Sequence, residues 1–184
     1  MRRRFARVIC ALMARRLDYS ARYPLRTTKE LYAALSNRDY WDARMVEMNK
    51  YAPGNEVASF EAGDDGIDVV LNHVLPREML PEIAQTVMRK DMVITHKETF
   101  GPFGPEVEGK FSASIPAGPG SLGGTMRMFP TDTGCTMRYS SEAKVFIPML
   151  GPRLEQLMLI NLVDLFRGEA EFTIQWLDEQ NPIS

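Results

Sequence analysis

The chain has 184 residues, of which 45% are hydrophobic and 25% charged, and this composition predicts one globular domain with a substantial core. A net charge of -2 argues against nucleic-acid binding, which usually needs a basic face, and two cysteines cannot build a disulfide framework or a four-cysteine zinc site. The low cysteine count makes a reducing cytoplasm the expected compartment. No apolar run reaches the roughly 20 residues that span a bilayer, so we expect a soluble protein.

Residues 1–13 are basic and amphipathic, with arginines around apolar residues that share one helical face. Three interpretations compete: a weak membrane-surface contact through residues 2–12, a secretion signal, and an N-terminal extension without a role of its own. The signal is disfavoured because the apolar run meets Arg15 and Arg16 and no small-residue cleavage pattern follows. We therefore predict an extension over 1–13 and a single domain over 14–184.

The first elements predicted in the domain are a strand and a helix. Apolar and polar residues alternate over 16–23, which is typical of a half-buried strand, and Pro24 ends the pattern. Thr27 or Thr28 can cap the helix that follows, with Glu30 in its first turn.

A second helix and a hairpin come next. The second helix is expected over 39–48. Two strands, over 57–62 and 67–75, are joined by Gly63-Asp64-Asp65-Gly66, whose residues tolerate positive φ in a tight turn.

The rest of the chain predicts a short helix, four strands and one long helix. Residues 76–88 have apolar residues at helical spacing, with Pro81 among them. The strands are expected over 92–100, 107–115, 122–129 and 135–147. The final helix runs from Pro152 to about Asp178 and would be on the order of 40 Å long at 1.5 Å per residue. This order predicts an α+β fold in which a curved antiparallel sheet of about seven strands wraps around the C-terminal helix.

Several segments carry a resemblance to a known superfamily. They are Thr28–Ser36, Tyr40-Trp41, Gly63–Gly66, Thr95–Phe100, Pro116–Gly120 and Val145–Gly151. In these the chain resembles the START-like helix-grip superfamily (SRPBCC, which includes Bet v 1-like proteins), and more narrowly it is similar to an uncharacterised bacterial family, domain of unknown function 2505. The resemblance implies a helix-grip fold with a cavity for lipids, sterols, hormones or polyketides between sheet and helix. It implies no catalytic motif.

Strand alternation places polar residues on the face that turns toward the long helix. His96 and Glu98 share their face with Ile94 and Phe100, and the same argument turns His73 and Tyr139 inward. His96 and Glu98 could work as a general acid and base, or they could be hydrogen-bonded wall residues of a cavity. Their spacing does not resemble a metal site, so we expect neither a metal nor a cofactor.

Two residues of the long helix also suggest a cavity. Asn161 falls inside the apolar stripe and could bond to a ligand's polar end, while Gly168 could open space there. The alternatives are an ordinary polar contact and a packing glycine. The full set of predicted ligand contacts is His73, His96, Glu98, Phe111, Met126, Met137, Tyr139, Met158, Asn161 and Leu165.

Three functions remain open. We favour a nonenzymatic binder or carrier of a small apolar ligand, because an apolar cavity with few polar groups suits such molecules. A cyclase or dehydratase that uses His96 and Glu98 is the second. The third is a module without an open cavity that binds protein or membrane.

Overall fold

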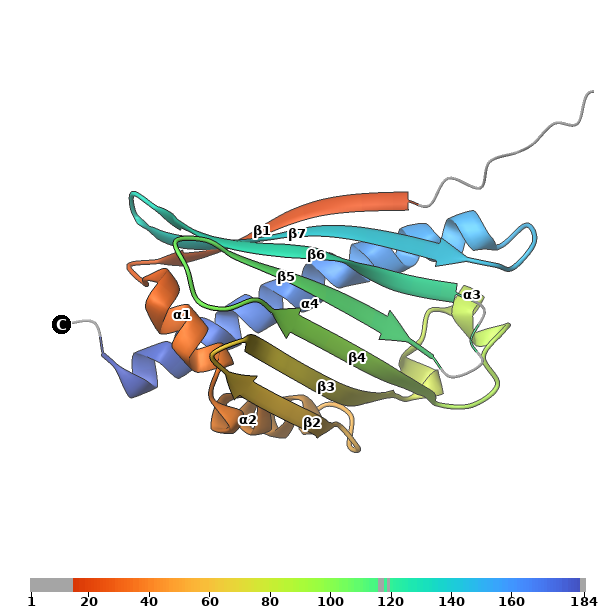
Figure 1. Cartoon of the computed structure of the whole chain (residues 1–184). Coiled ribbons are helices and arrows are strands. Elements are labelled where there is room, and N and C mark those ends of the chain that lie inside the picture. The colour runs from red at the N-terminus through yellow and green to blue at the C-terminus, as the bar shows by residue number, and fades with distance from the viewer. Residues whose placement is uncertain (1–14, 116–117, 119, 183–184) are drawn as a thin grey trace, which may run out of the picture.

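The computed structural model describes residues 15–115, 118 and 120–182 (Figure 1). The extension predicted over 1–13, and the membrane contact through residues 2–12, lie outside the described residues. The elements follow in the order β1 (Arg15–Pro24), α1 (Thr28–Leu35), α2 (Arg38–Asn49), β2 (Glu56–Gly63), β3 (Gly66–Leu75), η1 (Arg77–Met79), α3 (Glu82–Gln85), β4 (Met92–Phe100), β5 (Val107–Ser114), β6 (Gly120–Thr131), β7 (Gly134–Val145) and α4 (Gly151–Gln180).

The strands form one seven-stranded sheet in the order β1-β7-β6-β5-β4-β3-β2, and every neighbouring pair is antiparallel. The first strand thus closes on the last, with Tyr19 opposite Tyr139. The sheet curves, and α4 runs along its concave face, where it packs chiefly against β1 and β7 (Figure 1). The predicted helix-grip architecture is confirmed.

Local signals explain where the first helix and the hairpin begin. Thr27 caps α1 because its Oγ1 accepts a hydrogen bond from the Glu30 N–H at 3.2 Å, while Glu30 Oε2 accepts one from the Thr27 N–H at 2.8 Å. Gly66 ends the hairpin turn with φ of 131°, and a Cβ at this position would collide with the carbonyl oxygen of Phe100.

An aromatic cluster fills the space between the middle of α4 and the β1–β7 side of the sheet. The Phe166 ring stacks on Tyr139 with centroids 3.9 Å apart, and it meets Phe111 at 5.8 Å and Tyr19 at 5.7 Å. This part of the interior is therefore packed core.

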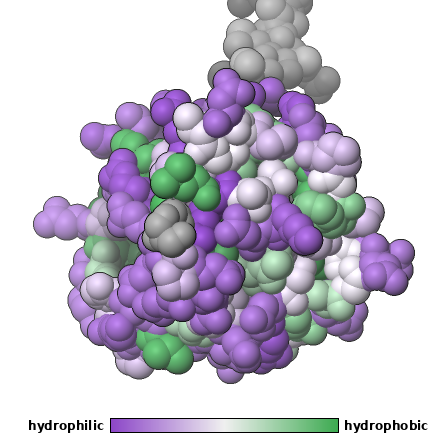
Figure 2. All heavy atoms as spheres, turned by 90° about the vertical axis from the view of Figure 1, so that its left-hand side faces the viewer, coloured by the Kyte–Doolittle hydropathy of each residue, from purple (hydrophilic) through white to green (hydrophobic). Residues whose placement is uncertain are grey.

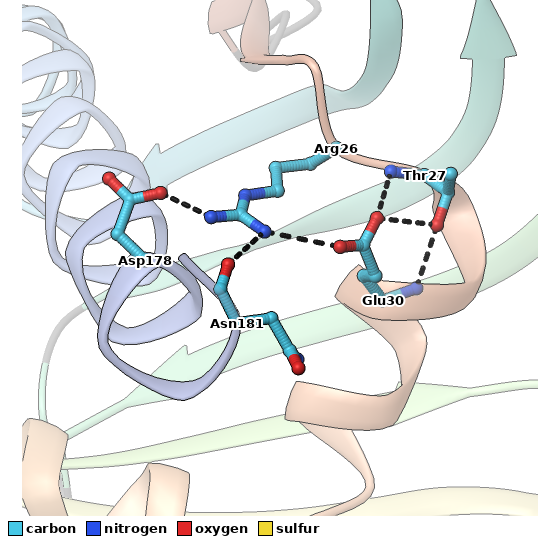
Figure 3. A network of polar contacts seen from close by, with 5 residues as sticks. All are labelled: Arg26, Thr27, Glu30, Asp178 and Asn181. Atoms are coloured by element: carbon cyan, nitrogen blue, oxygen red, sulfur yellow. Dashed lines mark hydrogen bonds and ion pairs between the residues drawn. The ribbon is translucent and has the colours of Figure 1, made fainter. Parts of the chain in front are cut away.

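A second anchor holds the C-terminal end of α4 (Figure 3). Arg26, just before α1, is buried and donates from Nη1 to the Asn181 carbonyl at 2.9 Å and to Glu30 Oε1 at 3.1 Å. Its Nη2 pairs with Asp178. A cation at this position also complements the negative end of the helix dipole.

The surface around this anchor is mainly hydrophilic, with a few separate hydrophobic residues (Figure 2). None of the helices in the described part of the chain is both long enough and apolar enough to cross a membrane.

Most element ends differ from the sequence prediction by one or two residues, and two of the differences have a clear physical reason. The last strand ends at Val145 and not at Ile147, because Phe146 turns outward with 61% exposure and the chain folds back toward α4 at Pro148. The helical segment predicted over 76–88 is only a 3-10 turn and the one-turn helix α3, separated by Pro81, which cannot donate a helix hydrogen bond.

Candidate functional site

Four charged or titratable side chains meet in the interior, where α2, β4 and α4 face one another. Arg44 comes from α2, His96 and Glu98 from β4, and Glu169 from α4. Arg44, His96 and Glu98 are 4%, 6% and 6% exposed. We call these four residues the Arg44 cluster. Buried charges are expensive unless they are paired, so such a group calls for an explanation.

Arg44 pairs with both carboxylates of this cluster. Its Nη2 contacts Glu169 Oε1, and its Nη1 lies 3.7 Å from Glu98 Oε1. The guanidinium also lies over the Trp41 ring, 5.2 Å from the centroid, and its Nε has no hydrogen-bond partner among the described residues. One guanidinium therefore serves two carboxylates.

The pKa values follow from this burial. Burial opposes the charge of Arg44, but attraction by Glu169 and Glu98 outweighs it and keeps the pKa of Arg44 above its ordinary value. Burial raises the pKa of both Glu98 and Glu169, against the opposing effect of Arg44. If both carboxylates are ionised, the Arg44 cluster holds one surplus negative charge.

The two histidines do not compensate for that charge. Burial, together with the charge of Arg44, lowers the pKa of His96 to about 4 against the opposing effect of Glu169, and it lowers the pKa of His73 to about 3. Both rings are therefore neutral at pH 7. His96 Nε2 lies 3.6 Å from Glu98 Oε1, and with a neutral imidazole this contact is not an ion pair.

His73 extends the Arg44 cluster toward β3. Its ring lies 5.8 Å from the His96 ring, and its Nδ1 lies 3.3 Å from Asn55 Oδ1. Asn55 is buried and its amide NH₂ faces Asn49 Oδ1 at 3.2 Å, so Asn55 Oδ1 is the acceptor and His73 Nδ1 the donor. This arrangement leaves a lone pair on His73 Nε2.

The structure divides the predicted contact residues into three groups. His73, His96 and Glu98 come together, and the alternation that turned them inward agrees with the burial of His96 and Glu98 and the half-burial of His73. A second group belongs to the packed core around Phe166. Its members are Phe111, Met126, Met137 and Tyr139. Their role as ligand contacts stays a prediction.

The third group is Met158, Asn161 and Leu165, which share one side of α4. Leu165 is 37% exposed, and Asn161 is exposed as well. The prediction that Asn161 lies inside the buried stripe is wrong, because Leu162 points inward and the residue before it is turned by about 100°. The packing role considered for Gly168 is also wrong, since a Cβ there would meet nothing within 4 Å.

This side of α4 faces a part of the sheet that the helix does not cover. Glu169, one turn beyond Leu165, reaches Arg44 of α2, so the side looks away from β1 and β7. The inward residues in this region are half-buried. They are His73 on β3, Ile94 on β4, Ala113 on β5 and Leu122 on β6. The Arg44 cluster borders this half-covered surface.

Sequence reasoning missed Arg44, Glu169 and Asn55. Arg44 follows Trp41 by three residues and so lies on the apolar side of α2, and Glu169 follows Phe166 by three residues. A charge within an apolar stripe was the available signal. Among the described residues, no three His, Cys, Asp or Glu side chains are arranged to hold a metal ion.

Comparison with solved structures supports the fold. TTHA0849 from Thermus thermophilus superposes with a TM-score of 0.55 at 17% identity, covering 88% of this chain and 98% of that one. Ara h 8.0201, which has the Bet v 1-like fold, gives 0.51 at 9% identity over 90% of this chain and 98% of its own. At these identities the likeness concerns the fold alone.

Sequence relatives extend over nearly the whole chain. The uncharacterized proteins Rv0481c of Mycobacterium tuberculosis and Mb0491c of Mycobacterium bovis are both 31% identical over 176 residues, which is 90% of this chain and 98% of each relative. Residues 18–177 match the family described as "Protein of unknown function (DUF2505)". The chain is therefore a member of the DUF2505 family, with the START-like helix-grip fold.

Proposed function

We propose that this protein binds or carries a small hydrophobic molecule, of lipid or polyketide type, between its sheet and α4. The observation that carries the proposal is the uneven cover of the concave face. Because α4 packs chiefly on β1 and β7, the inward residues of β3 to β6 near His73 remain half-buried. A partly covered apolar surface with a few polar groups at its border suits such a ligand.

The aromatic cluster restricts where the ligand lies. Phe166 fills the space over Tyr139 and Phe111, so the ligand's place is the β3 to β6 side. Met158 and Leu165 lie on the side of α4 that looks toward it. Superfamily members use the space between sheet and helix in the same way, as the resemblance implies.

The test is ligand retention and uptake by the full chain. Native mass spectrometry after gentle purification is expected to show a bound apolar compound, and the stripped protein is expected to take up the apolar fluorescent probe N-phenyl-1-naphthylamine. Ala113→Trp places a bulky ring on the half-covered surface and should abolish uptake. Ser112→Trp, on the outer face of the same strand, is the matched control and should retain it.

Two results would contradict the proposal. The first is a wild-type protein that neither retains a compound nor takes up the probe. The second is a folded Ala113→Trp variant that binds the probe as well as the wild type.

A further inference from the structure

Two of the three guanidinium nitrogens of Arg44 are directed at groups inside the protein, and only its Nε–H has no hydrogen-bond partner among the described residues. Arg44 points Nη1 and Nη2 at the two carboxylates. No hydrogen bond from a described residue reaches the Oε2 atom of Glu98 or Glu169. The side chains of Glu98 and Glu169 are 7% and 11% exposed. The oxygens left over are acceptors.

His73 adds to this excess of acceptors, whereas neutral His96 brings one donor and one acceptor. His73 uses its Nδ1–H on Asn55, so its Nε2 presents a lone pair, and His73 itself belongs to the half-covered surface. His96 is more than nine-tenths buried, yet neither ring nitrogen has a hydrogen-bond partner among the described residues. Both ring nitrogens of His96 are therefore available to the polar head of a ligand, one as a donor and one as an acceptor.

The charge balance points the same way. Two carboxylates face one guanidinium, and both imidazoles are neutral. The other titratable side chains that face this group are Tyr23 of β1, Tyr40 of α2 and Tyr139 of β7, whose pKa values are raised by burial so that all three hydroxyls stay neutral. With both carboxylates ionised, an additional anion would meet uncompensated negative charge, whereas a cation would remove it.

We infer that the polar end of the bound molecule is a hydrogen-bond donor, an amine in preference to an alcohol, that meets Glu98 and the two imidazoles. This inference rests on the proposed function and narrows its ligand class. It disfavours ligands whose head is a carboxylate or a phosphate, because such heads bring further acceptors and further negative charge to a site where acceptors already outnumber donors.

The experiment compares three ligands that share one alkyl chain length and differ in the polar head group. They are n-dodecylamine, 1-dodecanol and dodecanoate, and each competes with N-phenyl-1-naphthylamine for the full-length protein. Dodecylamine is expected to bind at least tenfold more tightly than dodecanoate, with dodecanol between them. In the Glu98→Gln variant the affinity for dodecylamine should fall at least tenfold, whereas the affinity for dodecanoate should not fall. Glu108→Gln removes the same charge from the outer face of β5 and should leave the order unchanged.

Glu98→Gln keeps the shape of the side chain and leaves Arg44 paired with Glu169, and circular dichroism will check its fold. Glu169→Gln removes a cluster carboxylate from α4 and provides the same test if the first variant does not fold. The inference is overturned if dodecanoate binds as tightly as dodecylamine, or if neither cluster variant changes the order. A protein that does not bind the probe at all overturns the proposed function as well, which is a distinguishable result.

Discussion

Because buried His96 is neutral in the folded protein, the stability of the protein depends on pH. In the unfolded chain the imidazole has its ordinary pKa of 6.5, whereas in the fold burial lowers its pKa to about 4. Between these values the unfolded state binds a proton that the folded state does not. Stability is therefore fully present above pH 6.5 and falls as the pH drops toward 4.

The size of the effect follows from the two pKa values. At 1.36 kcal/mol for each pKa unit, the difference between 6.5 and about 4 contributes about 3 kcal/mol. Glu98 and Glu169 act in the opposite direction, because burial raises the pKa of each and the folded state then holds protons more readily as the pH falls. The dependence of the unfolding free energy on pH is the sum of these contributions. A comparison of variants is therefore needed to isolate the contribution of His96.

The perturbation is His96→Gln, which removes the titration and keeps a polar side chain of similar size. Urea unfolding at pH 7 and pH 4 should show that the difference in unfolding free energy between wild type and variant changes by about 3 kcal/mol. NMR gives a direct check because the chain has two histidines, and His73→Gln assigns their signals. A His96 signal that titrates near pH 6.5, or a difference between wild type and variant that stays constant with pH, would refute the reasoning.

Three further variants test the packing. Gly168→Ala should raise the free energy of unfolding by about 1 kcal/mol in urea titration, since its Cβ meets only open space on a helix, and a loss of stability would contradict this. Arg26→Ala should lower it by roughly 2 kcal/mol and speed amide exchange in the last turn of α4, and exchange at the wild-type rate there would show that the anchor is unimportant. Phe166→Ala should lower it by about 3 to 5 kcal/mol by leaving a cavity beside Tyr139, and a change below about 1 kcal/mol would mean that the ring is not core.

The elements could be predicted because most of them bury one face only. A strand with a single buried face alternates, so the inward direction of His96 and Glu98 followed from the neighbours of each. The Thr27 cap and the turn at Gly66 were equally local, since each depends on groups a few residues away. These signals do not say which distant strand closes the sheet beside β1.

The centre of the candidate site could not be predicted, for a related reason. A charged residue on the apolar side of a short helix can extend its head into water or bury it, and periodicity does not distinguish the two. Arg44 is buried because Glu98 and Glu169, more than fifty residues away in the chain, supply its countercharges. Asn161 shows the opposite error: it neighbours the stripe in sequence, but the tight packing of α4 on β1 and β7 turns it outward.

The position of the Arg44 cluster indicates that the stability of the fold is not the main reason for its presence. Replacing a buried ion group with apolar residues of similar volume is often neutral or stabilising in proteins, so ion pairing alone is a weak reason for three charges to lie in this interior. The aromatic cluster around Phe166 already provides ordinary packing between α4 and the sheet. The charges lie instead where that packing ends, at the border of the surface that α4 leaves half-covered. There they give an otherwise apolar region a fixed polar end, which under the proposed function would orient an amphipathic molecule in a way that apolar contacts cannot.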